Sequence, residues 1–246
     1  MSIVGIDVGG TGIKGASVDL SSGRLATERT KIDTPQPATP EAVYAVIAKL
    51  AADSDDGPVG VTLPGIVRHG VVHSAANIDK SWLGVDADRA LTDLLKRQVR
   101  VMNDADAAGY AEVAYGAAHG RSGVVLVTTL GTGIGSALIH NGVLVPNTEL
   151  GHLEIDGHVA ERRASNSARE KGELSWDRWA KRLTVYYRTL ERLFSPDLFV
   201  VGGGVSKSSD KFLPLVDIDT EIVPAALGND AGIIGAALLA HEDVDG

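Results

Sequence analysis

The sequence predicts a duplicated α/β fold with two related domains around a cleft. Three observations lead to this prediction. The chain has 246 residues, which is room for one large α/β domain or two small ones. Short apolar runs typical of buried strands alternate along the chain with helical segments. A unit of strand, glycine-rich turn and strand near the N-terminus returns about half a chain later, and this return indicates an internal duplication.

The first half of the chain begins with the first copy of this unit. An apolar run predicts a strand over residues 3–7, and after the glycine-rich turn a second strand is expected over residues 13–19. A Ser-Ser-Gly turn then leads to a third strand, predicted over residues 25–32. Thr39 as N-cap and Pro40 as first helical residue predict a helix that ends near residue 52. The remaining predicted elements of this half are strands over 59–62 and 99–103 and helices over 86–96 and 104–115.

The second half opens with the second copy of the unit. A β-branched run at residues 124–130 leads into Gly131-Thr132-Gly133-Ile134, which repeats Gly10-Thr11-Gly12-Ile13. The later predicted elements are a strand over 136–139, a helix over 175–194, a strand over 198–201 and a helix over 231–241. Residues 1–104 with 232–246 are therefore expected to form a small N-terminal domain, and residues 105–231 a larger domain that carries the second turn.

Composition excludes several classes of protein. The chain has no cysteine, which rules out disulfide frameworks, thiolate catalysis and cysteine-based zinc or iron–sulfur sites. A formal net charge of −9 argues against non-specific nucleic-acid binding. No apolar run approaches the ~20 residues of a membrane span, and no signal segment opens the chain, so we expect a cytoplasmic protein without membrane contact.

The first glycine-rich turn is a candidate phosphate site. Gly10, Gly12 and Gly15 formally match the dinucleotide-binding fingerprint, but that fingerprint opens a helix, whereas these glycines lead into a strand-like sequence. The better interpretation is a hairpin in which the turn amides after Gly9 and the Thr11 hydroxyl hold a phosphate.

Charged residues flank this turn, and the second turn offers the same chemistry. Asp7 lies one step away, where its carboxylate would bind Mg²⁺ or its waters. Lys14 is a candidate ligand of the donor phosphate or a solubilising charge at a strand edge. Gly131, Thr132 and Gly133 would grip the same polyanion. Both turns also fit ordinary tight β-turns in which glycine supplies a positive φ, but the shared threonine favours phosphate binding.

Several motifs resemble the repressor–open reading frame–kinase (ROK) family of sugar kinases. They are Asp7-Val8-Gly9-Gly10-Thr11, Asn103-Asp104, Leu130-Gly131-Thr132-Gly133-Ile134-Gly135 and Glu149-Leu150-Gly151-His152. Residues 200–206 look like the third nucleotide-site motif of that family and add Gly203 and Gly204 to the phosphate- and nucleotide-binding candidates. The resemblance spans the chain and implies the actin-like, RNase-H-like duplicated fold. Residues 34–40, 76–82 and 223–227 resemble, more narrowly, the branch that phosphorylates glucose from inorganic polyphosphate.

One departure from the family pattern concerns zinc. Most members carry a cysteine-rich zinc loop after the Gly-His pair, whereas residues 153–165 of this chain contain no cysteine. We expect a solvated loop there and no zinc, and the polyphosphate branch also lacks the zinc loop. Glu161 aligns with the glutamate that follows the loop and binds the sugar.

The resemblance assigns roles to the polar residues. Asp104 would be the base that accepts the proton of the sugar 6-hydroxyl while the phosphoryl group leaves its donor in line; its position at the start of a helix also suits an N-cap. Trp82 fits a core anchor as well as it fits a sugar platform. The implied cofactor is Mg²⁺ with polyphosphate or ATP, and the implied assembly is a homodimer. The implied sugar-binding residues are Pro64, Gly65, Asn77, Asn103, Asp104, Glu149, His152 and Glu161.

Local charge bears on the donor. Between Glu161 and Arg192 nine basic residues stand against five acidic ones, so basic side chains concentrate there in an acidic chain. These residues predict either a groove for long polyphosphate, containing Arg178, Lys181 and Arg182, or an ordinary charged helix face.

The predicted activity is phosphoryl transfer from inorganic polyphosphate, and also from ATP, to the 6-hydroxyl of glucose. The alternative is an ATP-dependent hexokinase of the same family acting on glucose, mannose, fructose or N-acetylmannosamine. A sugar-responsive repressor of the family would need a helix-turn-helix before the first phosphate strand, and no room for one is expected before Ile3. Asp7, Asp104 and the two Thr-Gly turns disfavour a catalytically silent sugar-binding module. The relative use of the two donors and the accepted hexoses stay open.

Overall fold

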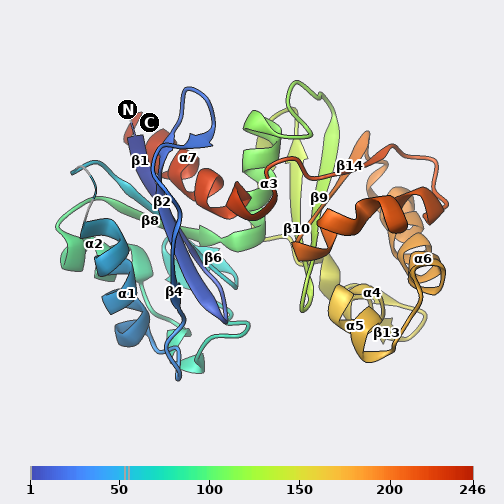
Figure 1. Ribbon diagram of the computed structural model, residues 1–246, viewed down its shortest axis with the longest axis horizontal. Helices are drawn as coiled ribbons and strands as arrows, with labels where there is room; N and C mark the ends of the chain where they lie inside the picture. Colours follow the sequence, from blue (N-terminus) through green and yellow to red (C-terminus); the bar gives the residue numbers. More distant parts are fainter. Residues whose placement is uncertain (1, 53, 55, 246) are drawn as a thin grey trace. The chain divides into compact units, whose positions relative to one another are not determined.

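The computed structural model describes residues 2–52, 54 and 56–245, and the chain divides into two compact units (Figure 1). Unit 1 comprises Met1–Ala111 and Asp230–Gly246, and unit 2 comprises Glu112–Asn229. The boundaries predicted from the sequence, after residue 104 and before residue 232, differ from these bounds by seven and two residues. That the two units act as the domains of a sugar kinase stays a prediction.

Unit 1 is built on a six-stranded sheet with the order β3-β2-β1-β5-β8, in which β4 also pairs with β2. β1 (Ser2–Val8) and β2 (Gly12–Asp19) form an antiparallel hairpin. β5 (Val59–Leu63) runs parallel to β1, and β8 (Val99–Asn103) runs parallel to β5. The strands predicted at these positions are confirmed.

The single strand predicted over residues 25–32 is wrong. The chain forms β3 (Arg24–Leu25) and β4 (Thr30–Asp33), both antiparallel to β2. Between them the Ser17 N–H donates to the Thr27 hydroxyl oxygen at 3.0 Å, instead of to a backbone carbonyl. A side chain thus takes the place of a backbone acceptor, and the ladder is interrupted there.

Helices cover both faces of this sheet. α1 (Pro40–Ala52) and α2 (Ala87–Leu95) pack on one face, and α7 (Ala231–Asp245) lies along the other face together with the start of α3 (Asp104–Tyr115) (Figure 1). Every second residue of β1 joins the core beneath α1, namely Val4, Ile6 and Val8. Asp7 lies on the opposite face, where Gly232 of α7 approaches it, so the alternation of the strand separates the core from the polar residue.

Unit 2 repeats this plan with a five-stranded sheet of order β11-β10-β9-β14-β15. β9 (Val124–Leu130) and β10 (Ile134–His140) form an antiparallel hairpin. β14 (Leu198–Gly202) and β15 (Ile222–Pro224) continue the sheet in parallel with β9, and β11 (Val143–Val145) lies at the other edge. The predicted duplication is confirmed, because β2-β1-β5-β8 and β10-β9-β14-β15 have the same order and the same strand directions.

The two hairpins differ by one residue in the length of the turn. Val8 pairs with Ile13 in the first hairpin, whereas Leu130 pairs with Ile134 in the second. The two phosphate turns are therefore equivalent in position but have different backbone geometries.

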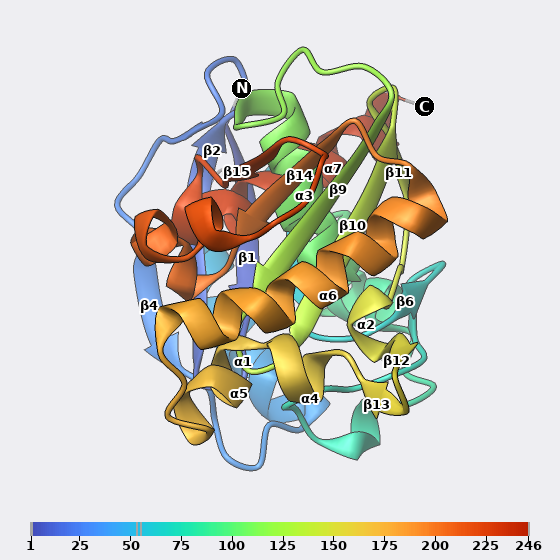
Figure 2. The ribbon, with the colours of Figure 1, turned by 90° about the vertical axis from the view of Figure 1, so that its right-hand side faces the viewer.

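The long helix α6 (Trp176–Phe194) crosses one face of the unit 2 sheet (Figure 2). Its buried residues Trp179, Leu183, Tyr187 and Leu190 pack on Phe199 and Val201 of β14 and their neighbours. The opposite helix face carries Lys181, Val185, Arg188 and Arg192, all of them exposed. This amphipathic arrangement is the one that the sequence predicted.

The expectation of a solvated loop over residues 153–165 is wrong. β12 (Glu154–Ile155) and β13 (His158–Val159) form a hairpin, followed by α4 (Glu161–Ala164) and α5 (Asn166–Lys171). Asp156 and Gly157 form its two-residue turn with φ of 52° and 73°, the backbone that an Asp-Gly pair favours in tight hairpins.

Short elements complete the described part of the chain. They are β6 (Val67–Arg68), β7 (Val71–Val72), η1 (Lys80–Trp82), η2 (Leu150–His152), η3 (Gly204–Lys211), η4 (Leu213–Leu215) and η5 (Gly228–Asp230). Trp82 of η1 is fully buried, and its indole N–H donates to the Ala38 carbonyl at 2.9 Å, so it anchors the core. In the portion of the chain that the structure describes, no helix combines the length and the apolar composition needed to cross a membrane.

Candidate active-site residues

The first phosphate turn is held in place by a neighbouring segment of unit 1. The Thr34 hydroxyl donates to the Gly9 carbonyl at 2.6 Å, and the Thr34 N–H donates to the Thr11 carbonyl at 3.4 Å. The Gln36 side chain donates to the Gly10 carbonyl at 3.3 Å. These bonds take up carbonyl oxygens of the turn, so the groups that it keeps for a ligand are N–H groups and the exposed Thr11 side chain. Such a turn suits an anion.

Asp7 is held from two sides. Its Oδ2 lies 3.1 Å from Lys14 Nζ, and its Oδ1 accepts a hydrogen bond from the Thr62 hydroxyl at 2.9 Å. The hairpin register places Asp7 opposite Lys14, so both side chains point to the same face of the sheet.

The carboxylate of Asp7 fits a role toward Mg²⁺ in its water shell. Mg²⁺ often binds through one or two carboxylates and keeps several waters beside substrate phosphates. Because both oxygens of Asp7 already have a partner, it is better placed to accept hydrogen bonds from metal-bound waters than to replace them. Within the described ranges of the chain, no group of three or more metal-ligating His, Asp or Glu side chains is present.

The junction of β8 and α3 positions the predicted base. Asn103 Oδ1 accepts from the N–H groups of Ala105 at 2.8 Å and Asp106 at 3.0 Å. Asn103 Nδ2 donates to the Gly65 carbonyl at 3.0 Å, and the side chain is buried. Asn103 is therefore the N-cap of α3, and the assignment of that duty to Asp104 is wrong. The cap leaves one amide hydrogen of Asn103 for a ligand.

Asp104 is the first residue of α3. Its Oδ1 accepts from the Ala105 N–H at 2.9 Å, and it is half-buried. The positive end of the α3 dipole stabilises a negative charge at this position. A carboxylate that is fixed at a helix start and partly open to solvent has the geometry of a general base.

The remaining predicted sugar residues of unit 1 lie near the turn and the cap. The Ala76 N–H donates to the Pro64 carbonyl at 2.8 Å, which joins the segments around Gly65 and Asn77. Asn77 lies against the first turn, since a Cβ added to Gly10 would meet the Asn77 Cβ at 2.8 Å. The structure thus places Pro64, Gly65 and Asn77 between the first phosphate turn and Asn103.

The second phosphate turn, in unit 2, lies beside the third glycine motif. Gly203 has a φ of 85°, and a Cβ there would come within 2.6 Å of the Leu130 carbonyl oxygen. Only glycine fits this close approach, which brings residues 203–204 alongside Gly131. No atom lies within 4 Å of a Cβ built on Gly131 or Gly204, so the space above both glycines is open to a ligand.

Glu161 connects this turn to the predicted sugar residues. Its Oε2 accepts a hydrogen bond from the Ile134 N–H at 3.2 Å and lies where the Cβ of any other residue at Gly133 would sit. Its Oε1 lies 3.8 Å from His152 Nε2, while His152 Nδ1 lies 4.0 Å from Glu149 Oε2. The imidazole therefore lies between two carboxylates.

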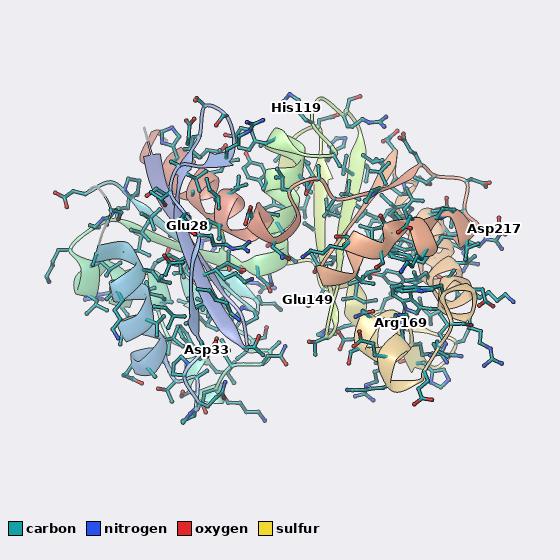
Figure 3. The ribbon with its side chains drawn as sticks, in the orientation of Figure 1. Glu28, Asp33, His119, Glu149, Arg169 and Asp217 are labelled. Atoms are coloured by element: carbon teal, nitrogen blue, oxygen red, sulfur yellow. The ribbon has the colours of Figure 1, made fainter. Side chains whose placement is uncertain are left out.

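Glu149, labelled in Figure 3, has the same side-chain exposure as Glu161, 30%. Burial raises the pKa of the Glu149 carboxyl, His152 opposes that rise, and the charge of Glu161 adds to it. Three polar groups with both donor and acceptor capacity suit the hydroxyls of a sugar.

A groove of about 220 Å³ starts at the second turn. Besides Glu161 and Ala168, its lining is basic or carries hydroxyl groups, from Thr132, Arg162, Ser165, Ser167 and Lys171. Two cations and three hydroxyls are a suitable lining for phosphate oxygens. The sequence analysis did not single out Ser165 and Ser167, although the basic segment that contains them was the signal.

Not every basic residue of that segment is available to a ligand. The guanidinium of Arg169 lies 4.2 Å from the centroid of the Trp176 ring (Figure 3), and Arg188 is paired with Asp217. Both residues therefore have structural partners.

Glycine-rich hairpin turns on two equivalent sheets, with a carboxylate at a strand–helix junction, define a phosphotransferase of the actin-like fold. The chain belongs to the ROK family, whose family model matches residues 3–166. It is 53% identical over 241 residues to the polyphosphate glucokinase of Mycobacterium tuberculosis (strain CDC 1551 / Oshkosh), covering 97% of this chain and 91% of the relative.

Solved structures agree with this family assignment. The inorganic polyphosphate/ATP-glucomannokinase of Arthrobacter sp. strain KM has a TM-score of 0.94 and 57% identity, with 98% of this chain and 99% of that chain covered. The ROK family glucokinase of Streptomyces griseus, in complex with glucose and AMPPNP, has a TM-score of 0.84 and 25% identity, with 98% and 100% covered.

Proposed function

We propose that this protein transfers a phosphoryl group from inorganic polyphosphate to the 6-hydroxyl of glucose. Relatives that are more than half identical over nearly the whole chain are a polyphosphate glucokinase and a polyphosphate/ATP-glucomannokinase. The observation that carries the choice of donor is the groove at Thr132. Its lining offers hydroxyls and cations to phosphate oxygens but no aromatic ring on which a base would stack.

Asp104 is the proposed general base. The sugar O6 attacks the terminal phosphorus, the bond from that phosphorus to the bridging oxygen breaks, and the shortened polyphosphate leaves with the bridging oxygen. The proton of the 6-hydroxyl passes to Asp104. The Ala105 N–H orients this carboxylate before the transfer.

The two turns are the proposed phosphate ligands. Thr11 and Thr132, with the N–H groups beside them, bind non-bridging oxygens, and Lys14 adds a positive charge. Mg²⁺, when bound with the donor, would neutralise charge on the transferred phosphate. Asp7 would hold waters of that ion.

Sugar recognition is the proposed role of several polar residues. Glu149, His152 and Glu161 are proposed to bind glucose hydroxyls, and Asn103 uses its remaining amide hydrogen. The segments at Pro64, Gly65 and Asn77 are proposed to shape the pocket wall.

ATP is the second proposed donor. Gly203 and Gly204 lie beside the second turn, and the open space above Gly204 leaves room for a nucleotide. An ATP-dependent hexokinase that does not use polyphosphate is the less supported function. We further propose that the enzyme works in the cytoplasm as a homodimer, and that it does not require zinc.

A coupled assay for glucose 6-phosphate tests the proposal with polyphosphate and ATP side by side. We expect turnover with polyphosphate in the absence of any nucleotide, and a loss of about 10²–10⁴-fold in kcat for Asp104→Asn with a nearly unchanged KM for glucose. Turnover with ATP but none with polyphosphate would reject the polyphosphate assignment. An Asp104→Asn variant with more than about a third of the wild-type kcat would remove Asp104 from the role of base.

A further inference from the structure

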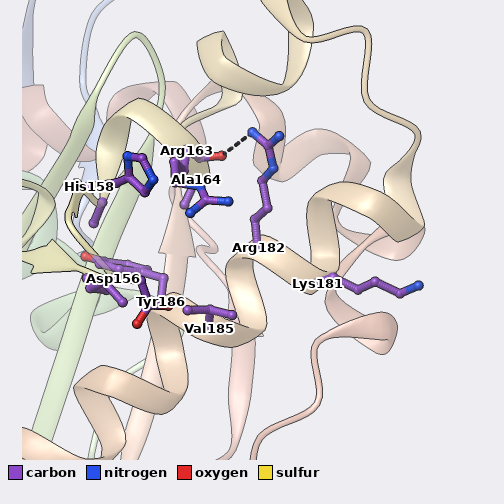
Figure 4. Close-up of a pocket in the computed structure, with 10 residues that line it drawn as sticks. Asp156, His158, Arg163, Ala164, Lys181, Arg182, Val185 and Tyr186 are labelled. Carbon is purple, nitrogen blue, oxygen red and sulfur yellow. Dashed lines mark hydrogen bonds between the residues drawn. The ribbon is translucent and has the colours of Figure 1, made fainter.

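A second basic pocket lies in unit 2, between the β12–β13 hairpin, α4 and α6 (Figure 4). Its volume is about 180 Å³. Arg163, Lys181, Arg182 and His158 contribute its basic groups, and Asp156 is the one carboxylate in its lining. The Lys181 side chain points away from the pocket (Figure 4). Two arginines, with His158 beside them, therefore stand against one carboxylate and make the pocket a candidate anion site.

Among the described residues, no acidic group pairs with the two arginines of this pocket, whereas the charge of Lys181 interacts with that of Asp177. The Arg182 guanidinium instead donates to the Arg163 carbonyl at 3.2 Å (Figure 4), which fixes it at the rim. Neighbouring cations repel one another, and a bound anion removes that repulsion.

The floor of the pocket is apolar. The ring of Tyr186 and the side chain of Ala164, which are 1% and 2% exposed, form it, while Val185, which also lines the pocket, is 47% exposed. A low-dielectric floor strengthens the attraction between the rim cations and an anion.

The pocket is adjacent along α4 to the groove at Thr132. Residues 161, 162 and 165 line the groove, whereas residues 160, 163 and 164 line the pocket. With 3.6 residues per turn, these two sets occupy opposite faces of α4. The consecutive residues Arg162 and Arg163 therefore serve the two cavities, and a long anion that passes the end of α4 meets both.

We propose that this pocket binds a phosphate group of the polyphosphate donor that is remote from the transferred one. The proposal rests on the proposed use of polyphosphate as donor. It explains why Arg163 of α4 and Arg182 of α6 meet at a pocket on the side of α4 opposite the groove. ATP carries only three phosphates, so we expect the pocket to act on longer donors.

The test compares a pocket variant with a matched control on the same helix. Arg163→Gln with Arg182→Gln removes two rim charges, whereas Arg178→Gln removes one exposed charge of α6 that does not line the pocket. We expect the double variant to raise KM for long polyphosphate by about 3- to 30-fold, as expected for two exposed ionic contacts. KM for tripolyphosphate, ATP and glucose should stay within about twofold of the wild type, as should all values for Arg178→Gln.

Kinetics and binding together separate the outcomes. If wild type phosphorylates glucose from long polyphosphate but the double variant has an unchanged KM, the pocket assignment is wrong while the proposed function stands. If wild type does not use polyphosphate, the proposed function fails. Calorimetric titration of wild type and double variant with long polyphosphate then tests separately whether the pocket binds it. Equal losses with every donor would indicate a general defect and overturn the assignment.

A small free phosphate compound presents the same chemical group to this pocket as polyphosphate does. Calorimetric titration of wild type and double variant with orthophosphate and with glucose 6-phosphate distinguishes the two sources. Weak binding of either ligand, unaffected by the double substitution, is expected. Tight binding that the substitution abolishes, with an unchanged polyphosphate KM, would overturn the assignment in favour of a site for small phosphates. A single variant, Arg163→Gln, repeats the kinetic test at an exposed side chain if the double variant folds poorly.

Discussion

Replacement of Asn103 tests two roles of this residue separately: stabilising the start of α3, which carries Asp104, and binding the sugar. In Asn103→Ala the side-chain acceptor of Ala105 N–H and Asp106 N–H disappears, and the Gly65 carbonyl loses its donor. Loss of an N-cap costs about 0.5–2 kcal/mol. Leaving a buried carbonyl unsatisfied costs about 1–3 kcal/mol more. The free energy of unfolding should therefore fall by about 2–4 kcal/mol.

Asn103→Ser is the matched control. Serine is a good N-cap and keeps an acceptor for the first turn of α3, but it loses the bond to the Gly65 carbonyl. It should be more stable than Asn103→Ala by about 1 kcal/mol. Its kcat should also be higher, because Asp104 is the next residue and its orientation depends on the cap. KM for glucose should rise equally in both variants if the remaining amide hydrogen of Asn103 binds the sugar.

Urea denaturation with a common slope and steady-state kinetics measure these quantities. Equal stability and equal kcat in Asn103→Ser and Asn103→Ala would refute the assignment of the cap to Asn103. A wild-type KM for glucose in both variants would leave the cap in place and remove Asn103 from sugar binding.

Three further expectations follow from the remaining polar residues. Gly133→Ala should raise KM for glucose more than Gly131→Ala does, because a Cβ at 133 collides with the Glu161 carboxylate whereas a Cβ at 131 meets nothing. Equal KM values in the two variants would count against the role of Glu161 in sugar binding. Burial raises the pKa of Glu149 above its ordinary value of 4.5, so the stability of wild type relative to Glu149→Gln should decline as the pH rises from 4 to 7. A difference in unfolding free energy that does not vary with pH in urea titrations would contradict this. Chelation of Mg²⁺ with EDTA should abolish glucose phosphorylation and leave the melting temperature in the absence of donor unchanged, whereas activity that survives EDTA would reject the metal requirement.

Periodicity and turn chemistry predicted most of the fold. The bounds predicted for α3 and β8 agree with the structure, since a β-branched run and an alanine-rich run have clear local preferences. The predicted strand over residues 25–32 failed because the Thr27 hydroxyl replaces a backbone acceptor, and a side-chain bond to a distant strand leaves no periodic signal. The β12–β13 hairpin was missed although Asp156-Gly157 is a strong turn pair, because its strands have only two residues each.

The candidate site was predictable in its residue types but not in its contacts. The Asn103-Asp104 doublet was found, yet which of the two caps α3 depends on a side-chain rotamer. The basic segment was found as a count of charges. Which members are unpaired depends on tertiary neighbours, since Arg169 lies over Trp176 while Arg163 lines a pocket. Sequence reasoning chose Arg178, Lys181 and Arg182; the last two line the pocket, whereas Arg178 lines neither the groove nor the pocket.

Phosphorus NMR of a nucleotide-free reaction tests the central claim most directly. Wild-type protein with glucose, long polyphosphate and Mg²⁺ should produce a phosphomonoester signal coupled to the protons on C6 of glucose, with a matching loss of internal polyphosphate signal, because each transfer turns an internal phosphate into a new chain end. Asp104→Asn under the same conditions should produce it about 10²–10⁴ times more slowly. Only orthophosphate from wild type, or a phosphomonoester that appears only after ATP is added, would contradict the account.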